Sequence, residues 1–139
     1  MQQEDYIKRQ IDQLGQVLGK ILSDLLGLKT KGQISKGIET ADQTLKNTLD
    51  LNIEDLCTIP TYKFMELLQA NNKLSNENFE MLANILFLLG NEAGYLDKNN
   101  KKKRKLNERS LIIYEYLNRV SSTYSLDRNL KIDKIKNAL

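Results

Sequence analysis

The chain has 139 residues, of which 40% are hydrophobic and 28% charged, with one proline, one cysteine and no histidine or tryptophan. The absence of histidine removes the commonest general base, metal ligand and pH switch near neutrality. A lone cysteine excludes an internal disulfide and favours a reducing compartment. The net charge of +3 conceals a division: residues 1–97 carry 9 cations and 14 acids, whereas residues 98–139 carry 12 and 4.

The apolar residues are mostly leucine and isoleucine, and valine occurs only at Val17 and Val120. This composition favours long amphipathic helices over a sheet. No apolar run approaches the ~20 residues that cross a bilayer, and the chain starts with acidic residues, unlike a secretory signal. We expect an all-α, cytoplasmic protein with no membrane span, folded as a single helical domain over residues 1–139.

A long N-terminal amphipathic helix is predicted within residues 1–28. Val17 and other flanking apolar residues widen its apolar stripe, so this helix must be covered on more than one side. Gly15 and Gly19 lie one turn apart beside the stripe, which indicates a close helix contact there. The stripe itself has spacings of four and three residues and consists of Ile7, Ile11, Leu14, Leu18, Ile21 and Leu25.

The middle of the chain predicts three shorter helices. The first spans residues 34–49, and a short turn follows at 52–56. Pro60 marks the start of a compact helix, and Ser75 is placed to cap the next one. The inward positions are Ile34, Ile38, Ala41, Leu45 and Leu49 in the first helix, and Phe79, Leu82, Leu86 and Leu89 in the last.

The C-terminal part begins with a low-complexity basic stretch at residues 97–105, which we expect to be a loop. A strong helix follows from Leu106, and Ser125 is predicted to cap a short final helix. The stripe of the strong helix is Leu106, Ser110, Ile113, Leu117, Val120 and Tyr124.

Five adjacent cations in that stretch form a candidate anion-binding site. Such a run binds phosphates electrostatically, but single-strand binders interleave aromatic residues, and none lies between Asp97 and Leu106. A solvated loop is the favoured interpretation. Binding of nucleic acid or an anionic surface by residues 98–136 is the alternative, and the cations are Lys101, Lys102, Lys103, Arg104 and Lys105.

No catalytic, cofactor-binding or metal-binding residue is predicted. Residues 97–108 match a calcium loop at some positions, but Lys102 stands where glycine is required. Residues 15–20 have one residue too few for a phosphate-binding loop, and Ile21 replaces its Ser or Thr. Cys57 has no histidine to activate it. We therefore expect a protein that is not an enzyme.

A partner-binding surface is predicted around two tyrosines. Tyr114 and Tyr116 cannot both face the core, because two residues turn a helix by roughly 200°. One of them should be exposed or line a groove, where an aromatic side chain beside cations suits a binding anchor. We expect Arg119, Arg128 and Lys131 to complete a groove for an acidic peptide.

Two resemblances bear on the fold. Leu86-x-x-Leu89-Gly90-x-x-Ala93 and Ser110-x-x-x-Tyr114-x-x-Leu117 resemble the two halves of a tetratricopeptide (TPR) unit with an eight-residue insertion between them. The segments 5–11, 107–117, 124–128 and 131–135 resemble a family of small, uncharacterised, TPR-like bacterial proteins. That resemblance implies TPR-like antiparallel helix pairs, with a pair plus a C-terminal helix in residues 75–139, and implies no activity.

These observations favour a protein–protein interaction module. Its expected partner is a protein or acidic peptide, and the N-terminal helix is a candidate for forming a homodimer.

Overall fold

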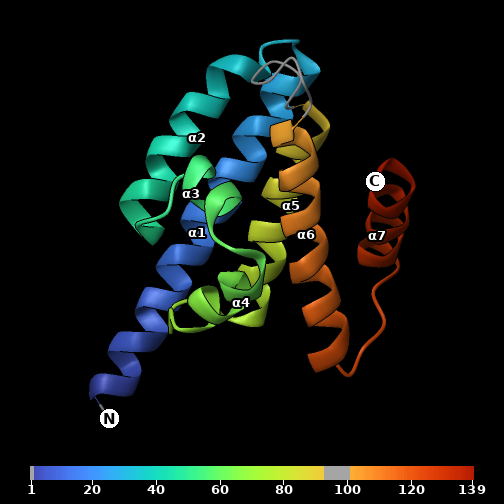
Figure 1. The fold of residues 1–139 in the computed structure, drawn as a ribbon. Helices are drawn as coiled ribbons and strands as arrows, with labels where there is room; N and C mark the ends of the chain where they lie inside the picture. The colour runs from blue at the N-terminus through green and yellow to red at the C-terminus, as the bar shows by residue number, and fades with distance from the viewer. Residues whose placement is uncertain (1, 93–100) are drawn as a thin grey trace.

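The computed structural model describes residues 2–92 and 101–139, and the side chains of residues 4–91 and 101–139. The described residues form helices and no strands, which confirms the prediction of an all-α fold (Figure 1). No helix in these ranges is long and apolar enough to span a membrane. The helices are α1 (Gln2–Thr30), α2 (Ile34–Leu49), α3 (Ile53–Thr58), α4 (Thr61–Gln69), α5 (Asn76–Glu92), α6 (Lys101–Val120) and α7 (Leu126–Ala138).

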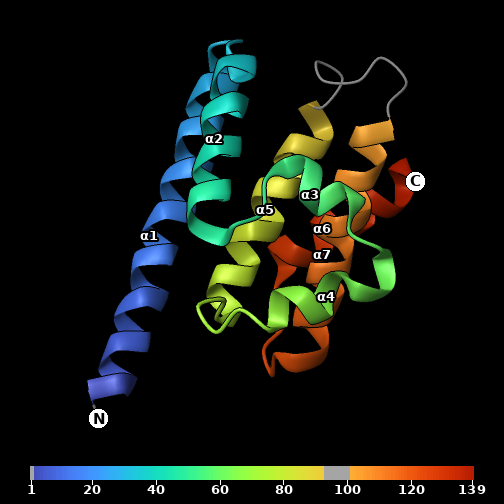
Figure 2. The same ribbon diagram turned by 60° about the vertical axis from the view of Figure 1, so that its left-hand side comes forward.

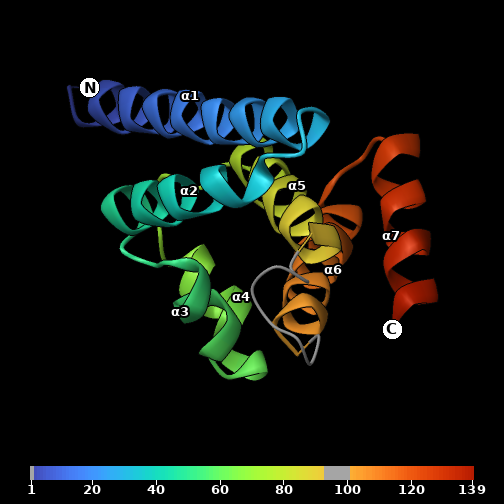
Figure 3. The ribbon, with the colours of Figure 1, turned by 90° about the horizontal axis from the view of Figure 1, so that it is seen from above.

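Helices α5 and α6 form the centre of the molecule and pack closely against each other. Figures 1 and 3 show α1 and α2 on one side of this pair and α7 on the other, while α3 and α4 lie over α6. The core is therefore continuous from α1 through α5 to α6, and buried side chains from all seven of these helices contribute to it.

Helix α1 is covered on two sides, as its wide apolar stripe predicts. It packs against both α2 and α5, and Leu14, Leu18, Ile21 and Leu25 are buried. The close contact predicted at the two glycines is with α5. A Cβ on Gly15 would lie 3.0 Å from Oδ1 of Asn78, and one on Gly19 would lie 3.7 Å from Sδ of Met81.

The sequence predicts a turn over residues 52–56, but residues 53–56 begin the short helix α3 and Asn52 is its N-cap. Asn52 and Asp55 form a capping box: Oδ1 of Asn52 accepts from the backbone N–H of Asp55 (2.7 Å), and Oδ2 of Asp55 accepts from that of Asn52 (3.0 Å). The bond from the Asn52 backbone also lowers the pKa of Asp55. The sequence carries this signal as a capping residue followed three positions later by an acid.

The basic run is helical, so the expectation of a loop is wrong for residues 101–105; residues 97–100 lie outside the described ranges. Helix α6 starts at Lys101, five residues before the predicted start. Cations at a helix N-terminus are unfavourable to the helix dipole. The ion pair between Lys102 Nζ and Glu54 Oε2 (2.7 Å) and the burial of Leu106 offset this cost.

The other end of α6 also differs from the prediction. Leu106, Ser110, Ile113 and Leu117 are buried as expected, but α6 ends at Val120, so Val120 and Tyr124 do not continue the stripe. They are 48% and 77% exposed. The backbone turns after Val120, and the Ser125 side chain accepts from the backbone N–H of Arg128 to start α7, as predicted. The predicted cap at Ser75 is likewise present, accepting from the N–H of Asn78.

A buried arginine joins α6 to α3 and α4. Arg109 is 1% exposed, and its guanidinium donates to the carbonyls of Leu56 (3.1 Å), Cys57 (3.3 Å) and Ile59 (2.6 Å). It also donates to Oγ1 of Thr61 (3.1 Å). These carbonyls end α3, where the helix dipole is negative and free acceptors need partners. Arg109 therefore fixes the α3–α4 corner on α6.

Replacing Arg109 should destabilise the protein more than any exposed arginine does. Arg109→Met leaves buried carbonyls without donors, and we expect it to lower the free energy of unfolding by roughly 3–5 kcal/mol in urea titrations. Arg109→Lys should lower the free energy of unfolding by a smaller amount, because the lysine ammonium keeps the charge but lacks the planar, forked donors of the guanidinium. Arg119→Met, at an exposed position of α6, is the control and should change stability by under about 0.5 kcal/mol. A loss of less than about 1 kcal/mol for Arg109→Met would contradict this role.

Candidate functional site

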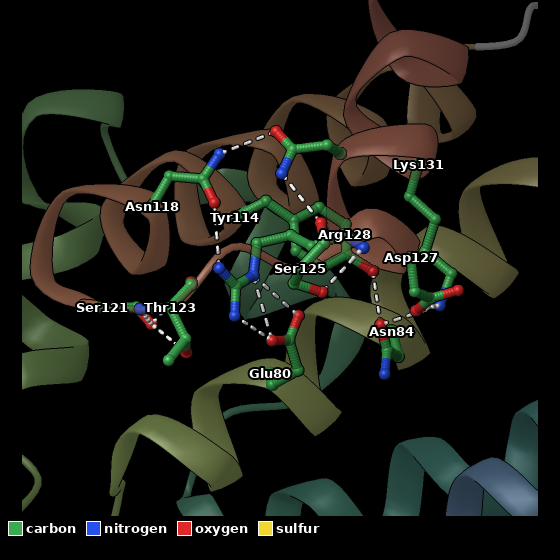
Figure 4. Close-up of polar contacts among 11 residues, drawn as sticks. Glu80, Asn84, Tyr114, Asn118, Ser121, Thr123, Ser125, Asp127, Arg128 and Lys131 are labelled. Atoms are coloured by element: carbon green, nitrogen blue, oxygen red, sulfur yellow. Dashed lines mark hydrogen bonds and ion pairs between the residues drawn. The ribbon is translucent and has the colours of Figure 1, made fainter.

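Three of the five residues predicted to bind a partner meet where α7 packs on α5 and α6. Figure 4 shows Tyr114 from α6 and Arg128 and Lys131 from α7 beside Glu80 and Asn84 of α5. Their polar atoms are joined by hydrogen bonds and ion pairs to groups of the same chain. We call this set of contacts the α7 network.

Arg128 makes the strongest contacts in the α7 network. It is buried, and its guanidinium binds Glu80 through Nη2–Oε1 (2.6 Å) and Nε–Oε1 (3.0 Å). Its Nη1 donates to Oδ1 of Asn118 at 2.9 Å. Nη2 and Nε both donate to Oε1, and Nε also lies 3.3 Å from Oε2. Hydrogen bonds between a guanidinium and a carboxylate are strong because both groups are charged. The acid that binds Arg128 is thus Glu80 of the same chain. From the sequence we expected an acidic group of a partner protein in its place.

Asn84 is the second centre of the α7 network. Its Oδ1 accepts from the hydroxyl of Tyr114 (2.5 Å) and from Nζ of Lys131 (3.1 Å). Lys131 also forms an ion pair with Asp127 (2.9 Å). Burial raises the pKa of Tyr114, so its hydroxyl stays protonated and donates. Lys131 therefore attaches α7 to α5, and Tyr114 attaches α6 to the same side chain of α5.

The other two predicted residues lie apart from the network. Tyr116 is half-buried, and its ring centroid lies 5.4 Å from that of Phe79. Arg119 is exposed near the end of α6. Neither tyrosine is exposed, although we expected one of the two to be exposed or to line a groove. Tyr114 is fully buried, and Tyr116 packs partly into the core.

The face of α7 that points away from the core is the surface that the sequence analysis missed. Leu126 and Leu130 are 62% and 59% exposed, whereas Ile132 and Ile135 on the opposite face are buried. At 100° per residue these two pairs lie about half a turn apart around the helix axis. We call Leu126, Leu130 and the neighbouring Tyr124 the outer surface of α7. The feature of the sequence that could have indicated this surface is a short helix with apolar residues on both faces.

The five cations at the start of α6 are only partly available to a ligand. Lys101, Arg104 and Lys105 are exposed, and Lys102 and Lys103 are half-buried. Besides the pair of Lys102 with Glu54, Lys105 lies 3.6 Å from Glu108, and Arg104 donates to the carbonyl of Leu139. Acceptors of the chain thus already contact three of the five.

Nucleophilic and metal chemistry receive little support from the geometry. Cys57 is buried at the end of α3, and desolvation raises the pKa of its thiol to about 11. Within the described ranges no three histidine, cysteine, aspartate or glutamate side chains are grouped to hold a metal ion.

No family model, curated protein or solved structure matches this chain. Its function is therefore inferred from its own residues and their arrangement.

The Glu80–Arg128 pair should show a measurable coupling energy. In a double-mutant cycle of Glu80→Gln and Arg128→Gln, we expect each single change to lower the free energy of unfolding by about 2 kcal/mol and the coupling to be about 1–3 kcal/mol. The exposed Lys20–Asp24 pair on α1, treated in the same way, should give under about 0.5 kcal/mol. Equal coupling in the two pairs would contradict the role given to Glu80.

Cys57 should react slowly while the protein is folded. With a pKa of about 11 against an ordinary value of 9.0, its thiolate fraction at pH 8 is roughly 100-fold lower than that of an unfolded chain. A disulfide reagent should therefore label native protein about 100-fold more slowly than protein in denaturant. Folding raises the pKa of this thiol, so the protonated thiol favours the folded state. Its contribution to the free energy of unfolding is therefore complete below pH 9 and is lost as the pH rises toward 11. Equal labelling rates would contradict the burial of Cys57.

Proposed function

We propose that the protein is a non-enzymatic, TPR-like protein–protein interaction module, and that the outer surface of α7 binds an acidic amphipathic segment of another protein. The observation that carries this proposal is the second apolar face of α7. The lack of histidine and the raised pKa of Cys57 disfavour acid–base and nucleophilic catalysis.

The TPR-like part of the proposal is supported by the contacts between α5 and α6. Ser110 occupies the small-residue position of the repeat, and its Oγ donates to the carbonyl of Ala83 (2.9 Å). A Cβ on Gly90 would lie 3.3 Å from the backbone N of Asn107. From Asn107 to Ser110 the contacts advance along α6, and from Gly90 to Ala83 they go back along α5. This order supports an antiparallel pair with small residues at the crossing. Ala93, the last residue of the repeat pattern, lies outside the described ranges.

An exposed second apolar face, such as that of α7, is what one unit of a stacked helical repeat offers to the next unit. Leu126 and Leu130 are one turn apart on α7, so their side chains lie side by side along the helix. A partner helix could place apolar residues against them at matching spacing, as in other helix-on-helix complexes.

The charge around this surface favours an acidic partner. Residues 119–139 carry five cations and two acids. Arg119, Lys134 and Lys136 are exposed; Lys136 lies 3.7 Å from Glu115, and Nζ of Lys134 lies 5.6 Å from the centroid of the Phe87 ring. Arg128 is already bound by Glu80. Binding therefore relies on the exposed cations and the outer leucines, in contrast to the expectation from sequence that Arg128 contacts the partner.

The alternative, binding of nucleic acid or an anionic surface through Lys101–Lys105, has weaker support. Glu54, Glu108 and the carbonyl of Leu139 already contact three of these cations. No exposed aromatic side chain is interleaved with them, as base stacking would need.

The proposal is tested with variants of exposed residues, which leave the fold intact. We expect Leu126→Ser/Leu130→Ser to keep the wild-type melting temperature and to weaken binding of a fluorescent peptide with a leucine–glutamate helical pattern by at least about tenfold, or ~1.4 kcal/mol. The control is Leu67→Ser, which removes a leucine exposed to a similar extent on α4 and should bind the peptide as wild type does.

Two further measurements separate the alternatives. A peptide with lysine in place of glutamate should bind at least about tenfold more weakly than the acidic one. If the acidic peptide binds equally well to the outer-surface variant, or if binding is lost only when Lys101, Arg104 and Lys105 are neutralised, the proposal fails.

A further inference from the structure

Helices α1 and α2 lie side by side (Figure 2), and a groove with a volume of about 570 Å³ runs between them. We call it the α1–α2 groove. A volume of this size is typical of small-molecule sites, which span roughly 300–1,000 Å³. The apolar residues that line the groove are all buried or half-buried and form its floor: Val17, Ile21, Leu25 and Leu28 of α1 and Ala41 of α2. Its exposed rim is polar and includes Ser23, Asp24 and Thr40.

Glycines on the two helices have different surroundings along this groove. Gly37 of α2 lies where the helices are close together, because a Cβ there would be only 2.5 Å from Cδ1 of Leu28. Gly27 also lines the groove, but a Cβ there would meet no neighbouring side chain or other helix within 4 Å in the described part of the chain. Glycine within a helix is less favourable than alanine. A molecule that occupies the space beside Gly27 would explain the small residue at this position.

One end of the groove, near the connection between α1 and α2, is cationic. Lys31 and Lys36 are exposed and line this end, and neither forms an ion pair with another described residue. The other charged residues of the lining, Lys20 and Asp24, pair with each other at 3.1 Å. Glu39 is one turn away from Lys36 on α2 but is not part of the lining. The lining therefore has an excess of two positive charges, both at one end of an apolar floor.

We propose that the α1–α2 groove binds a free, single-chain fatty acid, with the carboxylate at Lys31 and Lys36 and the acyl chain along the floor toward Val17. From Leu28 to Val17 the floor is about 17 Å long, at 1.5 Å per residue, which is close to the length of an extended dodecanoate. Beyond Val17 the lining becomes polar, for example at Gln13. The floor therefore fits an acyl chain of medium length.

The shape and the charge of the groove favour this ligand over a partner helix or a membrane. A helix segment of the same length, with a diameter of about 10 Å, has a volume of roughly 1,300 Å³, more than twice the 570 Å³ of the groove. Insertion into a bilayer needs exposed apolar side chains, whereas the exposed rim of this groove is polar. A fatty acid buries its chain on the floor and leaves its single negative charge beside the two lysines.

Calorimetric titration of the full chain with dodecanoate, below its critical micelle concentration, tests the position of the carboxylate. We expect saturable binding of one molecule to the wild type. Lys31→Gln/Lys36→Gln should weaken this binding at least about tenfold, because the carboxylate loses both cations. The matched control is Lys8→Gln/Arg9→Gln, which removes two exposed cations of α1 outside the lining and should bind dodecanoate as the wild type does.

Filling the groove tests the position of the acyl chain. Gly27 and Thr40 line the groove from opposite helices, so Gly27→Leu/Thr40→Leu narrows it from both sides. This variant should keep or raise the melting temperature, because leucine is a better helix former than glycine or threonine, and should bind dodecanoate at least about tenfold more weakly. Gly27→Ala/Thr40→Ala is the control; it leaves the groove open and should bind as the wild type does.

Ligand variants test the chemistry of recognition. Hexanoate should bind at least about 100-fold more weakly than dodecanoate, because it buries less apolar surface. Dodecyltrimethylammonium has the same chain with a cationic head group and should bind at least about tenfold more weakly. Leu126→Ser/Leu130→Ser should bind dodecanoate normally, so this inference and the function proposed for α7 stand or fall independently.

The inference is overturned if dodecanoate does not bind the wild type, or if the glutamine variant or the leucine variant of the groove binds it as tightly as the wild type does. Equally tight binding of dodecyltrimethylammonium would also overturn it. So would binding of the protein to phosphatidylglycerol vesicles without binding of free dodecanoate, because the groove would then serve a membrane.

Discussion

The guanidinium of Arg109 is the contact on which the arrangement around α6 depends. It carries a full charge into the core and is satisfied by the carbonyls that end α3 and by Thr61 at the start of α4. An unpaired group of this kind would cost several kcal/mol, so α6 and the α3–α4 corner must fold together. Once α6 is fixed in this way, its other side presents Ser110 and Tyr114 to α5 and Asn118 to α7. The position of α7, and thus of its outer surface, follows from that of α6.

Much of the helical framework could be predicted because it depends on local patterns. The core stripes of α2 and the first part of α6, and that of α1 from Leu14 onward, are buried at the predicted positions, whereas Ile7 and Ile11 are only half-buried. Both serine caps are present. The errors lie at helix ends. α6 starts within the basic run because Glu54, distant in sequence, pairs with Lys102, and α3 forms because Asn52 and Asp55 cap it. The start of α6 depends on a tertiary contact that the sequence does not show. The capping box that starts α3, by contrast, can be recognised in the local sequence.

The site was harder to predict, because its contacts join residues far apart in the chain. Glu80 and Arg128 are separated by 48 positions, and no periodicity indicates that an internal acid binds this cation. Residue type suggested that Arg128, Lys131 and Tyr114 bind a partner, but Arg128 and Lys131 attach α7 to α5, and Tyr114 attaches α6 to α5. The sequence alone did not show which way Leu126 and Leu130 face, because a helix with two apolar faces has no unique inward direction until its neighbour is known.

The central claim is that α7 is held by its inner contacts and recognises a partner with its outer surface. Titration of ¹⁵N-labelled protein with the acidic amphipathic peptide, followed by amide chemical shifts, tests it most directly. The account predicts that the largest shift changes fall on residues 119–134 and decline through α6 toward Lys101, with little change in α1 and α2. Changes centred on residues 101–105, or spread over the α1–α2 groove with α7 unaffected, would contradict it.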